Sequence, residues 1–376
     1  MSRSVIYRFS CAGFLAFTAA ILGTQRTSNA NAGLYDYHPV GSFTLPTDPS
    51  GNNVLFNSLS TGQLVTLNES QISVENSVGS GTFTPTGSLP ASFSPSFGPT
   101  FITAAPGSTE VAAGDGNGDI AVFNPSTPSA ATVYLLSANT FDFDAKWFNN
   151  NLLAITDSNG VDVLNATTGH VTNIITDIGG ASAGIAFDSA GNLYTGDGFY
   201  FGSGTSQTGL IKEFSASSWQ TALSSATPLD FEASGTQVAQ LLSANSLGFD
   251  NNGNFYVGGA DSFGTTGSFG FDALISASAI QGAVAQTSAP ITDSSSAADL
   301  REFPDPFGQF TPGFWDSNST TGDLYLSYFE QSQVQILSPV PEPRSITLLT
   351  LSGAAMILRR KRRSLSALSK PVYVAF

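Results

Sequence analysis

The sequence predicts an all-β protein, a β-propeller that most closely fits six four-stranded blades. Only 11% of the 376 residues are charged, and 38 glycines and 19 prolines leave little room for long helices. A strand–turn–strand pattern recurs six times along the chain. Its mean repeat over residues 33–338, about 51 residues, is the length of one four-stranded propeller blade.

Each repeat contains a short apolar strand, a turn rich in Gly, Asn or Asp, and a second apolar strand. The first strands begin at Val54, Val111, Leu152, Leu193, Phe255 and Leu324. The second strands begin at Leu64, Ile120, Val161, Leu210, Ala273 and Val334. We expect four of the first strands to be inner blade strands at equivalent positions around one axis. These four begin at Val111, Leu152, Leu193 and Phe255.

Two repeats share a longer motif, FDSAGNLYTGD at 187–197 and FDNNGNFYVGG at 249–259. A further short apolar strand precedes each motif. The Phe that opens the motif can fill the gap between two blades. The next residue, Asp188 or Asp250, can accept hydrogen bonds from turn amides. Residues 314–316 are a looser copy that ends on an aspartate.

These repeats resemble the NHL-type and gluconolactonase/regucalcin-like six-bladed propellers, and the resemblance concerns the scaffold. A gluconolactonase-like active site implies a metal held by carboxylates and Asn in the central channel. Asp188, Asp250 and Asp316 follow aromatic residues at matching places. They are therefore either convergent ligands of such a site or groups that cap turns. Their recurrence favours capping, because catalytic residues differ from blade to blade.

The charge distribution separates the body of the chain from its ends. Residues 33–338 hold 27 acidic residues but only three basic ones, Lys146, Lys212 and Arg301, for a net charge of −24. Such a body repels phosphate backbones, so nucleic-acid binding is excluded. The single cysteine, Cys11, lies before this body. Disulfides, Cys-ligated metals and a Cys nucleophile are therefore excluded from it.

Residues 1–32 are predicted to be a signal peptide for Sec export. Arg3 and Arg8 precede a 15-residue apolar run, residues 9–23, which is short for a membrane anchor. Ala30 and Ala32 place small residues before a cleavage point after Ala32.

Residues 339–363 form a second targeting segment. Pro341, Glu342 and Pro343 precede a 15-residue segment, 344–358, which is apolar after its first two residues. Because five cations then halt translocation, a short transmembrane helix is predicted, and an ordinary anchor is one interpretation. The cations are Arg359, Arg360, Lys361, Arg362 and Arg363.

This order resembles the PEP-CTERM sorting signal of Gram-negative bacteria. The resemblance implies recognition by an exosortase-type membrane protease, a transient inner-membrane anchor and removal of the tail. It also implies delivery to the cell surface or extracellular matrix, usually in producers of exopolysaccharide. Two features depart from the pattern: Arg344, where a small hydroxyl residue is common, and the unassigned tail 364–376.

One segment has ligand spacing for a metal. Asp115, Asn117 and Asp119 alternate with glycines, so their oxygens could converge on calcium. The same residue types are those that hairpin turns prefer, and both interpretations stay open. His38 and His170 are expected to be exposed, and no catalytic residue is identified.

Four aromatic residues lie in Gly-rich loops, where they could stack on sugar rings or pack beneath the loops. They are Phe199, Tyr200, Phe201 and Phe263. The sequence thus predicts an exported, non-catalytic binding or structural module for polysaccharide, protein or calcium. The alternative is a calcium-dependent lactonase or hydrolase of the regucalcin-like type.

Overall fold

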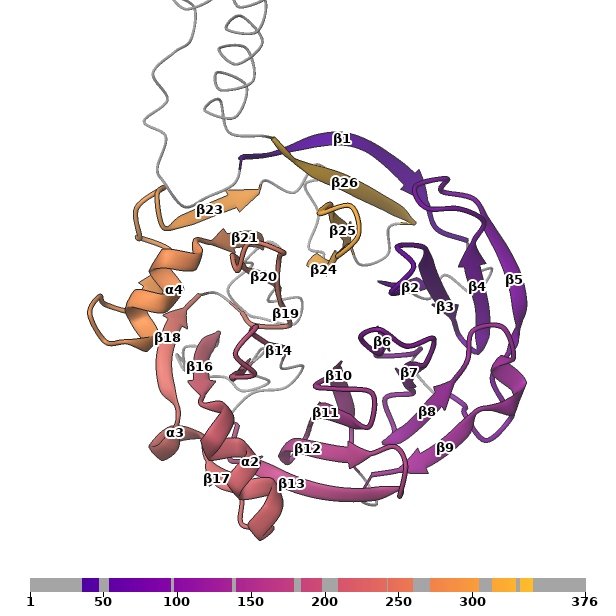
Figure 1. Ribbon diagram of the computed structural model, residues 1–376, viewed down its shortest axis with the longest axis horizontal. Coiled ribbons are helices and arrows are strands. Elements are labelled where there is room, and N and C mark those ends of the chain that lie inside the picture. Colours follow the sequence, from indigo (N-terminus) through magenta and orange to yellow (C-terminus); the bar gives the residue numbers. More distant parts are fainter. Residues whose placement is uncertain are drawn as a thin grey trace, which may run out of the picture. The chain divides into compact units, whose positions relative to one another are not determined.

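The computed structural model describes most of residues 36–340. The described ranges are 36–46, 54–95, 98–136, 140–178, 184–197, 209–241, 243–259, 271–303, 313–328 and 332–340. The chain divides into two compact units, Met1–Gly33 and Leu34–Phe376, and every described residue belongs to the second. This unit contains six separate sheets arranged as the blades of a propeller (Figure 1).

Blades 1 to 3 follow one another along the chain. Blade 1 contains β2 (Val54–Ser58), β3 (Leu64–Asn68), β4 (Gln71–Glu75) and β5 (Phe83–Ser88). Blade 2 contains β6 (Phe101–Ala104), β7 (Val111–Gly114), β8 (Asp119–Phe123) and β9 (Thr132–Leu135), with a 3-10 turn at Pro128–Ala130. Blade 3 contains β10 (Asp142–Trp147), β11 (Leu152–Asp157), β12 (Gly160–Asn165) and β13 (His170–Thr176).

Blades 4 to 6 complete the ring. Blade 4 contains β14 (Ile185–Phe187), β15 (Leu193–Gly196), β16 (Leu210–Phe214) and β18 (Thr236–Gln240). Blade 5 contains β19 (Ser246–Phe249), β20 (Phe255–Gly259), β21 (Phe271–Ile275) and β23 (Leu300–Phe303). Blade 6 contains β24 (Gly313–Ser317), β25 (Leu324–Tyr328), β26 (Gln333–Val340) and β1 (Asp36–Thr44).

The first strand of the chain closes the propeller. Strand β1 pairs antiparallel with β26 as the outer strand of blade 6, with Asp36 opposite Val340 (Figure 1). The innermost strands contact one another in the order β2, β6, β10, β14, β19 and β24, and β24 returns to β2. The predicted six-bladed propeller is therefore confirmed.

The structure corrects the predicted position of the strands within each blade. The strands beginning at Val111, Leu152, Leu193 and Phe255 are equivalent, as expected, but they lie second from the axis. Val54 instead begins an innermost strand, so the first repeat was offset by one strand. The error has a physical cause: second strands are buried on both faces and form strong apolar runs. Innermost strands such as β10 (DFDAKW) carry polar residues toward the axis.

Apolar side chains hold the blades together face to face. Among the described residues there are six hydrophobic clusters, and each joins one pair of neighbouring blades around the ring. Phe187 packs on Phe148 of blade 3, with ring centroids 5.3 Å apart, and Phe249 packs on Tyr194 of blade 4 at 5.0 Å. The prediction that these two phenylalanines fill gaps between blades is confirmed. Burial of this surface drives closure of the ring.

Two helices lie on the outside of the ring. Helix α2 (Ala216–Ser225) follows a strand of blade 4 and packs on β13 of blade 3 (Figure 1). Helix α4 (Ala277–Val284) follows a strand of blade 5 and packs on β18 of blade 4. The first turn of each helix is held by the same kind of hydrogen bond. Asn192 and Asn254, from the motif that two repeats share, accept hydrogen bonds from the amides of Ala216 and Ala277. The short strands that follow, β17 (Leu229–Asp230) and β22 (Ile291–Thr292), add in parallel to β13 and β18.

A third helix, α3 (Phe231–Ser234), is a single turn. Within the described ranges, no helix has the length and apolar character needed to cross a bilayer. The predicted signal helix and C-terminal transmembrane helix lie outside these ranges.

Candidate functional site: the central channel

Hydrogen bonds between innermost strands surround the channel. In blade 6, Asp316 Oδ1 accepts from Asn57 Nδ2 at 3.0 Å, and its Oδ2 accepts from the Ser58 amide at 2.7 Å. Asn57 Oδ1 in turn accepts from the Ala104 amide at 2.8 Å. These bonds link blades 6, 1 and 2 side by side.

The ring continues through blades 3 and 4. Trp147 Nε1 donates to the Thr103 carbonyl of blade 2 at 3.2 Å. Asp144 Oδ2 accepts from the Ile185 amide of blade 4 at 3.1 Å. The two channel carboxylates, Asp144 and Asp316, therefore each join two neighbouring blades through hydrogen bonds.

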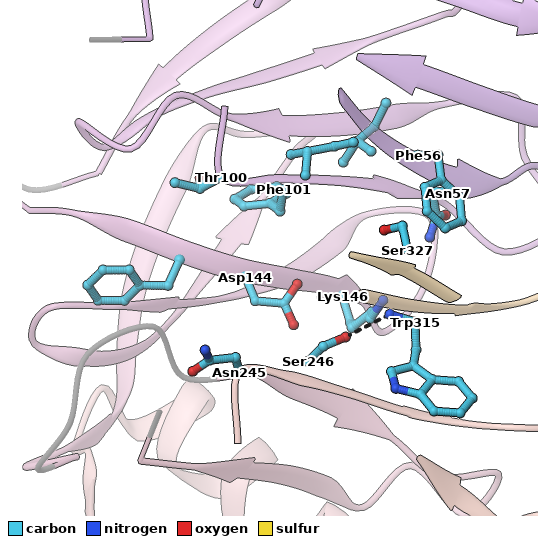
Figure 2. Close-up of a pocket in the computed structure, with 13 residues that line it drawn as sticks. Phe56, Asn57, Thr100, Phe101, Asp144, Lys146, Asn245, Ser246, Trp315 and Ser327 are labelled. Carbon is cyan, nitrogen blue, oxygen red and sulfur yellow. Dashed lines mark hydrogen bonds between the residues drawn. The ribbon is translucent and has the colours of Figure 1, made fainter. Parts of the chain in front are cut away.

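Two further bonds complete the circle. The Gly184 amide, just before β14, donates to the Ala244 carbonyl, just before β19, at 2.6 Å. Ser246 Oγ accepts from the Trp315 amide of blade 6 at 3.2 Å, the dashed line in Figure 2. Every pair of neighbouring blades is thus joined beside the axis.

The surroundings of the channel carboxylates change their acidity. Burial raises the pKa of Asp144 to about 6, although the charge of Lys146 and two backbone amides act in the opposite direction. Burial also raises the pKa of Asp316, again opposed by Lys146 and by hydrogen bonds from Ser58. Lys146 is the cation whose charge opposes both of these pKa shifts.

Lys146 differs from the other two basic residues of the body. Lys212 Nζ donates to the main-chain oxygen and the carboxylate of Glu232, at 2.8 and 3.1 Å. Arg301 donates to the Tyr37 carbonyl at 3.1 Å. Lys146, in contrast, makes no hydrogen bond or close ion pair with any residue that the structure describes. Its ammonium group is available to a ligand.

Two cavities meet at Lys146 and Asn57. The narrow one, about 50 Å³, also contacts Asp144, Asn245 and Ser246. Figure 2 shows Asp144 and Lys146 on one strand facing this space, with Asn245 and Ser246 across from them. The wide one, about 490 Å³, opens at the other end of the innermost strands. We call it the wide mouth.

Small residues widen this mouth on the side of blades 4 and 5. Ala186 and Gly248 stand where blade 6 has Asp316. A Cβ at Gly248 would overlap the hydroxyl of Tyr256, so glycine lets this second-strand tyrosine reach the channel. Burial and the nearby Asp316 raise the pKa of Tyr256, so its hydroxyl stays protonated.

The repeated aspartates cap turns. Asp188 Oδ1 accepts from the amides of Ala190 and Asn192, both at 2.9 Å. Asp250 makes the same pair of bonds in blade 5, at 2.8 Å each. The capping interpretation is therefore observed for both.

The third aspartate is different. In blade 6 the capping residue is Asn318, whose Oδ1 accepts from the Thr320 amide at 2.9 Å. Asp316 lies two residues earlier, inside β24. Its predicted equivalence to Asp188 and Asp250 is wrong, because the aromatic–aspartate pair is displaced along the strand.

The segment from Asp115 to Asp119 forms the turn between β7 and β8. Asp115 Oδ1 accepts from the amides of Asn117 and Asp119, at 2.7 and 3.0 Å. Burial and the Asp115 charge raise the pKa of Asp119. In the part of the chain that the structure describes, no group of three or more His, Cys, Asp or Glu side chains could hold a metal. Calcium binding by Asp115, Asn117 and Asp119 stays a prediction.

His38 and His170 are exposed, as expected. The remaining predicted site residues lie outside the described residues. They are Ala30, Ala32, Phe199, Tyr200, Phe201, Phe263, Pro341, Glu342, Pro343, Arg359, Arg360, Lys361, Arg362 and Arg363.

No protein-family model matches this chain, and no curated protein sequence matches it either. The function is therefore argued from the channel itself. Sequence reasoning did not identify Lys146 or Asp144 as channel residues. One feature of the sequence does point to Lys146, because it is one of only three basic residues in the acidic body, residues 33–338.

Proposed function

We propose that this chain is an exported, non-catalytic binding propeller whose ligand enters the wide mouth and is held by Lys146. The observation that carries the proposal is the free ammonium group of Lys146 at the junction of the two cavities. Ligand pockets commonly combine a concave surface with a few convergent polar groups. The wide mouth has both.

The regucalcin-like alternative requires several carboxylate or amide oxygens converging on a cation in the channel. Here the charge of Lys146 acts on both Asp144 and Asp316, and both carboxylates accept hydrogen bonds between blades. This arrangement supports a binding site over a metal centre.

The proposed export and release are compatible with the positions at which the first and last strands of the ring begin and end. Strand β1 begins four residues after Ala32, and β26 ends at the residue before Pro341. Removal of residues 1–32 and of the chain from Pro341 onward would leave every described strand of the ring in place, whereas removal from residue 339 would shorten β26 by two residues. The proposed mature protein, displayed at the cell surface or in the matrix, is therefore a complete propeller.

The binding site is tested with Lys146→Met, which removes the charge, and Lys146→Arg, which keeps it. We expect the methionine variant to lose retention on the cell-surface matrix by at least about tenfold, or roughly 1.4 kcal/mol. The arginine variant should retain part of it. Lys146→Met also removes the charge that opposes the raised pKa of Asp144 and Asp316, so its thermal unfolding is measured alongside retention, whereas Lys146→Arg keeps the charge and should unfold at the wild-type temperature. Equal retention of wild type and Lys146→Met would refute the site.

The sorting signal is tested by replacing Pro341, Glu342 and Pro343 with alanines. Export should continue, because the N-terminal signal is separate, and the cations from Arg359 to Arg363 should still stop translocation. The variant should accumulate at the inner membrane at full length, while the wild type appears outside the cell without its tail. Mass spectrometry of membrane, surface and culture fractions measures this. Equal release and equal shortening of both forms would remove the assignment.

A further inference from the structure

The outer strand of blade 2 is a sheet edge with little protection. Strand β9 lies on the rim of the ring and, among the described strands, pairs only with β8 (Figure 1). Its sequence, TVYL, contains no charge, proline or glycine, and its pairing has no bulge. Because an outer strand can accept a strand from another chain, proteins usually protect it with such features or cover it. Apart from being short, β9 has none of these protections.

The outer strands of the other five blades are protected. In blade 1, β5 contains Pro85, and in blade 6, β1 contains Pro39, each beside a shift in strand register. In blade 5, β23 carries the charged residues Arg301 and Glu302. In blades 3 and 4, β13 and β18 contact helices α2 and α4 and pair with the short strands β17 and β22. Among the described outer strands, β9 is therefore the one open to a further strand.

The backbone groups of β9 that point outward belong to Val133 and Leu135. The Leu136 amide donates to the Gly118 carbonyl at 2.9 Å, so these two residues form a hydrogen-bonded pair. Hydrogen-bonded pairs alternate along an antiparallel ladder, so Tyr134 also bonds β8. The amides and carbonyls of Val133 and Leu135 therefore face away from β8, where an added strand would bond them.

A groove beside β9 can receive side chains of an added strand. It has a volume of about 640 Å³, and residues of blades 2 and 3 line it, including Thr132 and Tyr134 of β9. Tyr134 Oη donates to the Ala166 carbonyl of blade 3 at 2.5 Å, which ties the two sides of the groove together. Alternate side chains of a strand point to one face of its sheet. Every second side chain of an added strand would therefore point to the side of the groove.

The groove is polar and nearly neutral. Glu110 is the only charged residue that lines it, and this carboxylate forms no ion pair with any residue that the structure describes. Such a surface suits small polar side chains with one cation opposite Glu110. An acidic segment would be repelled, as would a second copy of this body, which carries a net charge of −24. Most lining residues carry a hydroxyl or carboxamide group: Ser108, Thr109, Asn124, Thr127, Thr132, Tyr134, Asn150, Asn151 and Thr167.

We propose that β9 binds an extended segment of a partner protein, which adds to blade 2 as a further strand. The segment has no acidic residue, and it places small polar side chains and one Lys or Arg in the groove. Main-chain hydrogen bonds to Val133 and Leu135 supply affinity, and the groove selects the sequence. The site is separate from the wide mouth, because no residue lines both cavities. It does not rest on the function proposed for Lys146.

The test selects a phage-displayed library of random linear dodecapeptides on the purified full-length protein, and the enriched peptides are then synthesised. We expect bound peptides to slow hydrogen exchange at the amides of Val133 and Leu135. N-methylation of alternate peptide amides should weaken binding at least tenfold in one of the two registers, because it removes the main-chain donors.

Variants of the protein test the two halves of the site. Val133→Pro removes one outward amide and should abolish binding, whereas Val133→Thr keeps the amide and is the control. Glu110→Gln should weaken binding of peptides that contain Lys or Arg about threefold and leave uncharged peptides unchanged.

The remaining outcomes would overturn the proposal. Equal binding of methylated and unmethylated peptides in both registers would refute strand addition, and this result does not depend on how Val133→Pro folds. A library that yields no peptide protecting β9, or yields acidic peptides, would also refute the site.

Two further results would assign the binding elsewhere. If β9 becomes protected at high protein concentration without peptide, and Val133→Pro abolishes the dimer, a second copy occupies the edge and the partner proposal falls. If peptide binding is lost in Lys146→Met but kept in Val133→Pro, the peptide enters the wide mouth. The edge proposal would then fall while the function proposed for Lys146 stands.

Discussion

Blade 3 presents two different surfaces to its neighbours. Toward blade 4 it contributes Phe148, which packs against Phe187 and against Trp219 of helix α2, with ring centroids 5.3 and 4.8 Å apart. Toward blade 2, where β10 begins and β11 ends, it places Asp142 and Asp157 opposite each other in register. One interface is aromatic, and part of the other is acidic.

The acidic interface contains buried carboxyl groups. Asp142, Asp157 and Asp162 are 0, 4 and 6% exposed. Asp142 accepts from the Gly118 amide of blade 2 at 2.8 Å, and burial raises its pKa to about 6. Asp157 Oδ2 has no hydrogen-bond partner among the described residues. Burial, followed by the charge of Asp162, raises the pKa of Asp157 to about 7.

The comparison shows that one blade can meet its neighbours through contacts that do not titrate, such as Phe148 on Trp219, and through buried carboxyl groups that do, such as Asp157. Aromatic contacts do not titrate. A buried carboxyl with a raised pKa folds most easily as the neutral acid, so its ionisation costs free energy in the folded state. The interfaces of this propeller should therefore differ in how they respond to pH.

The largest expected effect is at the aromatic interface. Trp219 is fully buried, and its Nε1 donates to the Gly191 carbonyl at 2.9 Å. Trp219→Ala should lower the free energy of unfolding by about 3–5 kcal/mol, since it leaves a large cavity. Urea unfolding at acidic and at mildly alkaline pH should give the same loss. The exposed Leu135→Ala is the control, with an expected change within about 0.5 kcal/mol. A strongly pH-dependent loss at Trp219 would contradict the comparison.

The next effect concerns Asp157→Asn at the acidic interface. The unfolded carboxyl has a pKa of about 4, below the folded value, so the wild type loses stability as pH rises from about 4 to about 7. The amide cannot ionise. The variant should therefore be more stable than wild type by about 1–3 kcal/mol at pH 8, and the difference should shrink toward pH 4. Denaturant unfolding across this pH range measures it. A constant difference at all pH values would show that Asp157 does not titrate there.

The smallest expected effect is the stabilisation of the turn between β7 and β8 by added calcium. If Asp115, Asn117 and Asp119 bind calcium as predicted, millimolar calcium should stabilise the protein more than sodium at matched ionic strength. The gain should be on the order of 1 kcal/mol when calcium is several times its Kd. The double substitution Asp115→Ala with Asp119→Ala should remove it. Coincident thermal midpoints in calcium and sodium would mean that this segment is only a turn.

The sequence by itself determined the features that depend on neighbouring residues. Six strand–turn–strand repeats predicted the blades, because alternation and turn residues act over a few positions. Asp188 and Asp250 were identified as caps for the same reason, since each bonds amides two and four residues ahead. Gly191 and Gly253 lie in these turns with φ of 82° and 79°, where glycine is favoured.

Only the tertiary structure decided how distant segments meet. Asp316 bonds Asn57, 259 residues away in the sequence, and Tyr37 Oη bonds Asp250 across 213 residues. No local pattern encodes such a pairing, because it arises when six apolar interfaces close one ring and bring the ends of the body together. The same closure brings Asp316 near enough to Lys146 for the lysine charge to lower the pKa of this carboxyl. A strand sequence shows that a lysine alternates with apolar neighbours, but only the closed ring turns that face into the wall of a channel.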